Sequence, residues 1–162
     1  MDAKSFAVPA TCNCLAVRQA ARYITQFYDQ YLAAADLRTT QFGILAQLKC
    51  QGPMSINTLA AQLVMDRTTL GRNVRPLERD GLIAIEPDPA DQRSKILRLT
   101  RAGGARFERA RRQWVEAQMT FERTFGAGEA FALRQKLRAV VGSWLGPRVP
   151  QESGSARARS VS

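Results

Sequence analysis

The chain has 162 residues, 45% of them hydrophobic, and its 24 Lys and Arg against 14 Asp and Glu give a formal net charge of +10 without any histidine. A chain of this length can form one compact domain or a small reading head with a helical platform. Its large positive net charge favours a polyanionic partner. No stretch approaches the roughly 20 apolar residues that span a bilayer, and the N-terminus lacks an apolar signal core, so we expect a cytoplasmic protein with no membrane partner.

The first part of the chain is predicted to be helical after a flexible lead-in at residues 1–10. Apolar residues recur every three or four positions from residue 11 to about 35, which predicts a long first helix. A second helix is predicted over residues 40–49, and Thr39 is placed to act as its N-cap. The Gly52-Pro53 pair should end this helix, because proline cannot continue it.

A helix-turn-helix pattern follows in the middle of the chain. Ser55 is placed to cap a short helix over residues 56–63, and a tight turn separates that helix from another over residues 67–80. Asp66 stands where a carboxylate would cap the second of these helices, and Gly81 supplies the left-handed residue that ends it.

The helix over residues 67–80 has two distinct faces. At about 100° per residue, Leu70, Val74 and Leu77 share one side, and Thr68, Arg72, Arg75 and Arg79 share the opposite side. The apolar side would anchor the helix to a small core. The guanidinium groups and the hydroxyl suit phosphates and the base edges of a DNA major groove. The pattern therefore predicts a protein that reads DNA sequence.

Two short strands are predicted next, over residues 82–86 and 95–100. The loop between them holds two prolines and two aspartates, which are typical of an exposed turn and not of a buried connection. We therefore expect a projecting hairpin.

The last part of the chain predicts two more helices. Thr100 can cap one over residues 101–124, and a glycine-containing break at residues 126–128 precedes the other, over residues 129–145. Residues 147–162 have few apolar side chains and are expected to be a disordered tail. The helices carry more large apolar residues than one thin subunit can bury, which predicts a homodimer. The side chains that need a partner subunit are Trp114, Phe121, Phe131 and Trp144.

Catalytic and metal-binding patterns are missing from the sequence. There is no histidine, no Gly-rich phosphate loop and no recognisable pair of acids, so we expect no enzyme activity and no cofactor. Cys12 and Cys14 have no second pair and no histidine to complete a metal site, so we expect no bound metal.

Several short motifs follow one another in a specific order. They are Leu37-Arg38-Thr39-Thr40-Gln41-Phe42, Leu59-Ala60, Asp66-Arg67-Thr68-Thr69-Leu70 with Arg72, Leu77-Glu78-Arg79-Asp80-Gly81-Leu82-Ile83, Asp91-Gln92-Arg93, and Leu99-Thr100-Arg101-Ala102-Gly103. With this set, residues 11–145 resemble the multiple-antibiotic-resistance regulator (MarR) family of dimeric winged helix-turn-helix repressors. The resemblance implies a mainly α fold with a small β-wing, in a single domain over residues 11–146. A reading head at about 37–100 would stand on dimerisation helices at about 11–35 and 101–146.

The resemblance also implies roles for individual side chains. Those expected in the major groove are Thr68, Thr69, Arg72 and Arg75, with Arg67 and Asn73 at its margin. Arg93 at the wing tip would enter the minor groove, Asp91 would orient that loop, and Lys95 completes the DNA-binding set. A two-fold dimer would place its recognition helices about 34–36 Å apart and require a pseudo-palindromic operator.

The signal that releases such a repressor has two candidates. The first is a small aromatic or anionic effector in a cleft lined by Arg18, Arg22, Tyr23, Tyr28 and Phe42. The second is oxidation of Cys12 or Cys14, since the family includes peroxide sensors with a cysteine near the start of the first helix. We favour the small effector, because no histidine or paired thiol supports a dedicated redox switch. A protein of another class, a nonspecific nucleoid- or RNA-binding protein, would also be basic, and a gel-shift comparison of one duplex with random DNA and RNA distinguishes it.

Overall fold

The computed structural model describes residues 8–89 and 95–143. In chain order these form α1 (Val8–Thr11), α2 (Asn13–Leu32), the 3-10 turn η2 (Ala33–Ala35), α3 (Thr39–Gln51), β1 (Met54–Ser55), α4 (Ile56–Gln62), α5 (Arg67–Arg79), β2 (Ile83–Pro87), β3 (Lys95–Leu99), α6 (Arg101–Phe125) and α7 (Ala127–Gly142). None of the helices in these ranges is long and apolar enough to span a membrane. The fold is the mainly α fold with a small wing that the sequence predicts.

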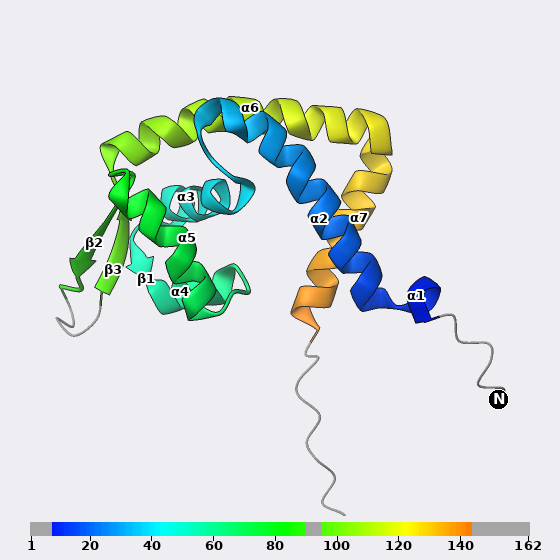
Figure 1. The fold of residues 1–162 in the computed structure, drawn as a ribbon, viewed down its shortest axis with the longest axis horizontal. Helices are drawn as coiled ribbons and strands as arrows, with labels where there is room; N and C mark the ends of the chain where they lie inside the picture. Colours follow the sequence, from blue (N-terminus) through cyan, green and yellow to red (C-terminus); the bar gives the residue numbers. More distant parts are fainter. Residues whose placement is uncertain (1–7, 90–94, 144–162) are drawn as a thin grey trace, which may run out of the picture.

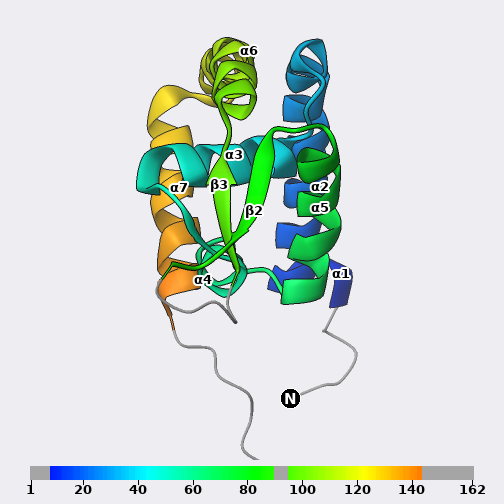
Figure 2. The same cartoon turned by 90° about the vertical axis from the view of Figure 1, so that its left-hand side faces the viewer.

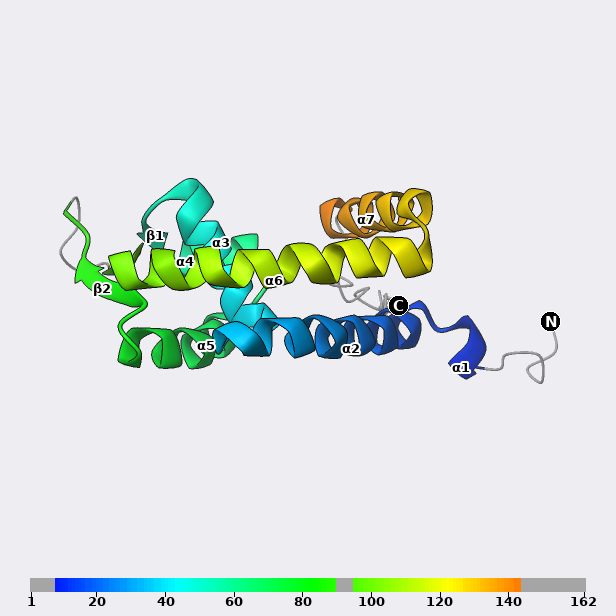
Figure 3. The ribbon, with the colours of Figure 1, turned by 90° about the horizontal axis from the view of Figure 1, so that it is seen from above.

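The long helix α6 joins two differently built regions (Figure 1). One is the reading head, which consists of α3, α4, α5 and the three strands and lies under the first half of α6. The other is the platform, which consists of α2, the second half of α6, and α7. Seen from above, α2 and α7 flank α6 on opposite sides (Figure 3).

A single hydrophobic core fills the reading head. Leucines from three helices, Leu45 of α3, Leu59 of α4 and Leu70 of α5, are fully buried in it together with Ile83 and Leu97 of the sheet. The C-terminal end of α2 and the first half of α6 close this core from above. The apolar spacing of the helix-turn-helix segment is therefore explained by one shared core.

The sheet of the reading head has three antiparallel strands in the order β1-β3-β2, and β2 and β3 form the hairpin of the wing (Figure 2). Ile83 pairs with Leu99 at one end of this hairpin and Pro87 with Lys95 at the other. The hairpin was predicted from the sequence, but β1 was not. This strand has only two residues, too few to show an alternating pattern, and it exists because Met54 lies opposite Leu97.

Three predicted helix starts are confirmed by side-chain caps. Ser55 Oγ accepts a hydrogen bond from the Thr58 N–H at 3.1 Å, and Thr100 Oγ1 accepts one from the Gly103 N–H at 2.9 Å. Asp66 caps α5, and Gly81 follows it with φ of 68° in the left-handed region. Local caps of this type satisfy N–H groups that the first turn leaves unpaired.

Other predicted boundaries are wrong. Thr39 is not the N-cap of α3 but its first residue, and the capping position belongs to Arg38. Residues 8–10 are helical, as part of α1, and do not belong to a lead-in. The last helix begins directly after Gly126, whose φ of 97° alone makes the break, and it ends at Gly142. The predicted tail lies outside the described residues.

Candidate nucleic-acid interface

Helix α5 lies in the reading head with its two faces as the sequence predicts. Leu70, Val74 and Leu77 are at most 2% exposed and lie in the core. On the opposite face Thr68, Arg72 and Arg75 are exposed to solvent. The core therefore fixes the rotation of α5 about its axis, and this rotation directs the polar face outward.

The start of α5 is held by Asp66. Its Oδ1 accepts a hydrogen bond from the Thr69 N–H at 2.8 Å, and its Oδ2 accepts one from the Thr69 hydroxyl at 2.6 Å. The hydroxyl bond of Thr69, followed by its backbone bond, holds the pKa of the Asp66 carboxyl below its usual value. Asp66 is thus a carboxylate at the helix N-terminus, where a negative charge is favourable.

Two predicted DNA-contacting side chains already make contacts inside the helix. The Thr69 hydroxyl donates to Asp66, and the Asn73 amide donates to the Thr69 carbonyl at 2.9 Å. By contrast, no described residue pairs with the guanidinium groups of Arg67, Arg72 or Arg75. These three cations are the side chains of α5 that are available for an anionic ligand.

The polar face of α5 borders two adjoining concavities between this helix and the sheet. One of about 570 Å³ is lined by Arg67, Arg72 and Arg75. The second, of about 420 Å³, lies between Arg67 and Lys95 of β3. Residues 67 and 95 are distant in sequence, and the fold brings them to one surface. Such an array of arginine and lysine can hold phosphates while leaving bidentate donors for base edges.

One polar residue at this surface was missed in the sequence. Asn57, in the first turn of α4, lines the concavity with Arg67 and Lys95 and is exposed. Its position two residues after the capping Ser55 was the available signal, because the first turn of a helix presents unpaired N–H groups and polar side chains to an anion. Glu78 adds one negative charge to the far end of the larger concavity.

The chain is similar to known transcriptional regulators over most of its length. The sequence model of the MarR family matches residues 37–95. The HTH-type transcriptional repressor NicR of Pseudomonas putida is 30% identical over 130 residues, which are 78% of this chain and 80% of NicR. The chain belongs to the MarR family. Its fold, its classification as a transcriptional regulator and its lack of an enzymatic role follow from that membership.

Further comparisons place this MarR-family chain within a diverse group. The M. tuberculosis transcriptional regulator MosR, solved in complex with DNA, is 33% identical with a TM-score of 0.72, over 81% of this chain and 94% of that one. The transcriptional activatory protein BadR of Rhodopseudomonas palustris is 31% identical over 88 residues, which cover 52% of this chain and 50% of BadR. The relatives thus include a repressor and an activator.

The wing tip of this MarR-family chain is not described. Asp91 and Arg93, predicted to orient the wing and to enter the minor groove, lie outside the described residues. Lys95, the first residue of β3, is a basic residue of the wing that the structure places at the concavity.

A chain of polar contacts crosses the platform from α2 to α7. The Tyr28 hydroxyl donates to Gln118 Oε1 at 2.6 Å, the Gln118 amide donates to Glu122 Oε1 at 2.8 Å, and Arg134 donates to the same oxygen at 2.9 Å. Burial, and then the charge of Glu122, raise the pKa of Tyr28. The hydrogen bonds from Gln118 and then Arg134 lower the pKa of Glu122. Tyr28, Gln118 and Arg134 line a largely apolar cavity of about 280 Å³ that also touches Thr39 of α3.

The five predicted effector residues do not lie around one cavity. Tyr28 borders the cavity with Arg134, and Tyr23 borders a separate one of about 170 Å³ with Phe27 and Phe121. Phe42 is in the core, stacked on Phe107 at 5.3 Å. The remaining two, Arg18 and Arg22, are exposed on α2. Gln118 and Arg134 were missed because they interrupt apolar stripes and resemble surface positions in the sequence.

All three cysteines are free thiols. Cys12 is the N-cap of α2, and its Sγ accepts a hydrogen bond from the Leu15 N–H at 3.4 Å. Cys14 is exposed two residues further on, in the first turn of α2, and Cys50 is exposed near the end of α3.

Proposed function

We propose that this regulator is a homodimeric repressor that binds a pseudo-palindromic DNA duplex through α5 and the wing. The observation that carries the proposal is the exposed set of Arg67, Arg72 and Arg75, which no described residue pairs with, beside Lys95. A helix of this kind fits the major groove of B-form DNA, whereas the major groove of RNA is too narrow to admit it. The repressor NicR and the MosR–DNA complex support the same conclusion by similarity.

The homodimer is supported by apolar side chains that the single chain leaves uncovered. Phe125, Phe131 and Val141 are 50%, 58% and 66% exposed, and they lie at the end of α6 and along α7. Several large apolar side chains exposed close together on one subunit are typical of a protein interface and support a partner subunit. Trp114, one of the residues that motivated the prediction, is instead stacked within the chain on Phe42, and Trp144 lies outside the described residues.

Release by a small effector is supported by the cavity at Tyr28 and Arg134. Its aromatic walls and its guanidinium group suit a small aromatic or anionic compound. Thr39 at the edge of this cavity belongs to α3, so an occupant would touch both the platform and the reading head.

The experiment that tests the function is selection of a duplex from a random pool, followed by titration of the selected duplex, a scrambled duplex and a matched RNA. We expect a preference of at least about a thousandfold for the selected duplex over the scrambled one, as specific regulators show. Equal affinity for all three nucleic acids would instead identify a nonspecific binding protein. Sedimentation at the same concentrations determines whether the bound species is a dimer.

A further inference from the structure

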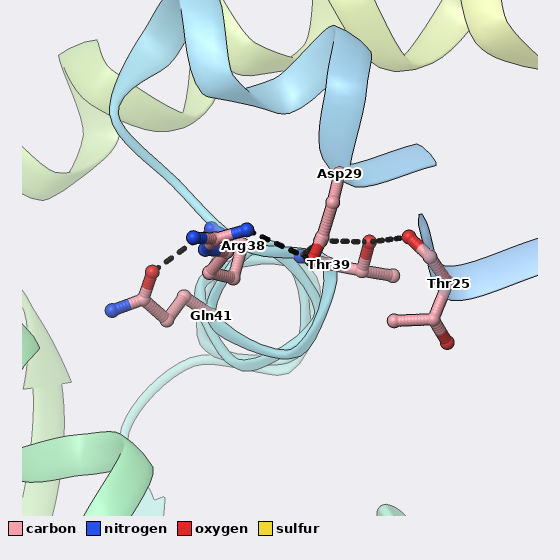
Figure 4. Close-up of polar contacts among 5 residues, drawn as sticks. All are labelled: Thr25, Asp29, Arg38, Thr39 and Gln41. Carbon is pink, nitrogen blue, oxygen red and sulfur yellow. Dashed lines mark hydrogen bonds and ion pairs between the residues drawn. The ribbon is translucent and has the colours of Figure 1, made fainter. Parts of the chain in front are cut away.

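The start of α3 is tied to α2 by one carboxylate. Asp29 Oδ1 accepts hydrogen bonds from both the N–H and the hydroxyl of Thr39, each at 2.7 Å, and Asp29 Oδ2 lies 3.4 Å from Arg38 Nη1 (Figure 4). The Thr39 hydroxyl also lies 3.4 Å from the Thr25 carbonyl of α2. A group of five residues thus joins the platform to the first helix of the reading head, and Gln41 completes it by accepting from the Arg38 N–H at 2.9 Å.

Asp29 does for α3 what a local N-cap does for α4, α5 and α6. The first N–H groups of a helix lack partners within it, and α4, α5 and α6 satisfy one such group with their own Ser55, Asp66 or Thr100. In α3 the acceptor comes from ten residues upstream, on another helix. Hydrogen bonds to a carboxylate are shorter and stronger than neutral ones, and the Asp29 side chain is only 19% exposed. The bond therefore fixes the direction in which α3 leaves α2.

A second set of contacts at the same junction is more exposed. Asp36, with φ of 53°, lies 3.2 Å from Arg109 and 3.6 Å from Arg106 of α6, and its side chain is 78% exposed. Ion pairs in water contribute little, because solvent screens them. Asp29 and Asp36 thus form a natural pair for comparison. Both hold the α2–α3 junction, Asp29 by bonding to the first residue of α3 and Asp36 by pairing with the first half of α6, but only Asp29 is shielded from solvent.

The direction of α3 determines the position of α5. Ile44 and Leu45 of α3 share the core with Leu70 of α5, so the two helices move together. In a homodimer the platform defines the two-fold axis, and the angle between α2 and α3 then sets the distance between the two recognition helices. We infer that Asp29 is a positioning residue that fixes this distance and, with it, the half-site spacing that the dimer accepts. The inference rests on the proposed function for its link to DNA, and on the Asp29–Thr39 contact for the geometry.

The test compares operators in which the two selected half-sites are moved apart or together by one and two base pairs. We expect the wild type to lose about tenfold in affinity for each displaced base pair, and Asp29→Ala to lose about threefold or less. Asp29→Asn keeps an oxygen that can accept both Thr39 bonds and should restore the wild-type spacing preference. Asp36→Asn is the matched control, because it removes the charge and tolerates the left-handed backbone at φ of 53°, and it should leave the preference unchanged.

A merely structural role for Asp29 would lower thermal stability without altering the dependence on spacing, and that result would overturn the inference. Should Asp29→Ala fail to fold, Thr39→Val removes the hydroxyl donor, keeps the N–H and should flatten the spacing profile in part. An unchanged profile in Thr39→Val would then contradict the inference in the same way.

The geometry can also be measured without DNA. The three natural cysteines are replaced by serine, and spin labels are attached at Arg79→Cys in the reading head and Lys136→Cys on the platform. When the labelled protein is diluted with unlabelled protein, the labels report one distance between the reading head and the platform. Asp29→Ala should broaden this distance distribution, and Asp36→Asn should not. If the wild type selects no duplex, the proposed function is refuted, and this distance measurement still decides the role of Asp29. Equal distance distributions in the wild type and the two variants would exclude that role.

Discussion

The reading head and the platform bury their apolar residues to very different degrees. In the reading head Leu45, Leu59, Leu70 and Leu77 are completely buried by the chain itself. On the platform Met119, Phe131 and Val140 remain more than half exposed. Because uncovered apolar surface is unfavourable in water, this difference indicates that the chain completes the core of its reading head and leaves apolar platform surface open, where the proposed partner subunit would pack.

Breaking the proposed subunit interface should have the largest effect. We expect Leu137→Glu combined with Val141→Glu to convert the dimer into a monomer and to abolish operator binding, because both side chains are exposed in one chain and would meet a partner. Sedimentation measures the assembly, and titration with the selected duplex measures the binding. Gln135→Glu on the same helix is the control and should leave both unchanged. A folded monomer that bound the palindromic duplex at full strength would show that the platform is not an interface.

The contact between the first turn of α6 and the reading head should respond next. A Cβ at Gly103, in the first turn of α6, would collide with the Leu82 carbonyl oxygen and lie 2.8 Å from Leu99 Cδ1. Backbone cannot yield cheaply, so Gly103→Ala should lower the free energy of unfolding by about 1–3 kcal/mol. Gly104 is a matched control, since nothing lies within 4 Å of its Cβ position, and Gly104→Ala should stabilise α6 by up to about 1 kcal/mol. Chemical denaturation of both variants measures the difference, and equal effects would show that the close approach is not a constraint.

The sequence was most informative where a side chain acts on its own helix. Ser55, Asp66 and Thr100 were predicted as caps from their residue types and their positions before a helix. In the structure each accepts a hydrogen bond from the N–H three residues further along the chain. Thr39 was assigned the same role wrongly, because its partner is Asp29 on another helix, and no local pattern contains that contact.

At the candidate site, too, local sequence patterns predict a helix face but not the contacts between different elements. The polar face of α5 follows from helical spacing, so Arg72 and Arg75 were predicted, and their exposure is confirmed. The approach of Arg67, Asn57 and Lys95 to one concavity depends on the packing of α4 and the sheet against α5, which spacing cannot reveal. Their contacts with DNA remain predictions.

Base readout by α5 should give a smaller effect than loss of the dimer. We expect Arg72→Ala to weaken binding to the selected duplex by about 1–3 kcal/mol and to relax the preference at one base position, if the guanidinium group makes a bidentate base contact. The measurement is titration of the selected and the scrambled duplex. Lys136→Ala removes an exposed cation from the platform and is the control. Equal losses of Arg72→Ala on both duplexes would identify a phosphate contact instead.

The smallest effect is expected at the cysteines, which are divided between the two regions. Cys12 and Cys14 lie at the start of the platform helix α2, and Cys50 lies on α3 of the reading head. Cys12 Sγ caps α2 through the Leu15 N–H, and a serine hydroxyl can replace it, because serine is a preferred N-cap. We therefore expect Cys12→Ser and Cys14→Ser to bind the selected duplex like the wild type, with and without organic hydroperoxide. Cys50→Ser is the internal control in the reading head. If hydroperoxide releases the wild type from DNA and the Cys12 or Cys14 variant resists this release, the signal is oxidation of that cysteine and not a small effector.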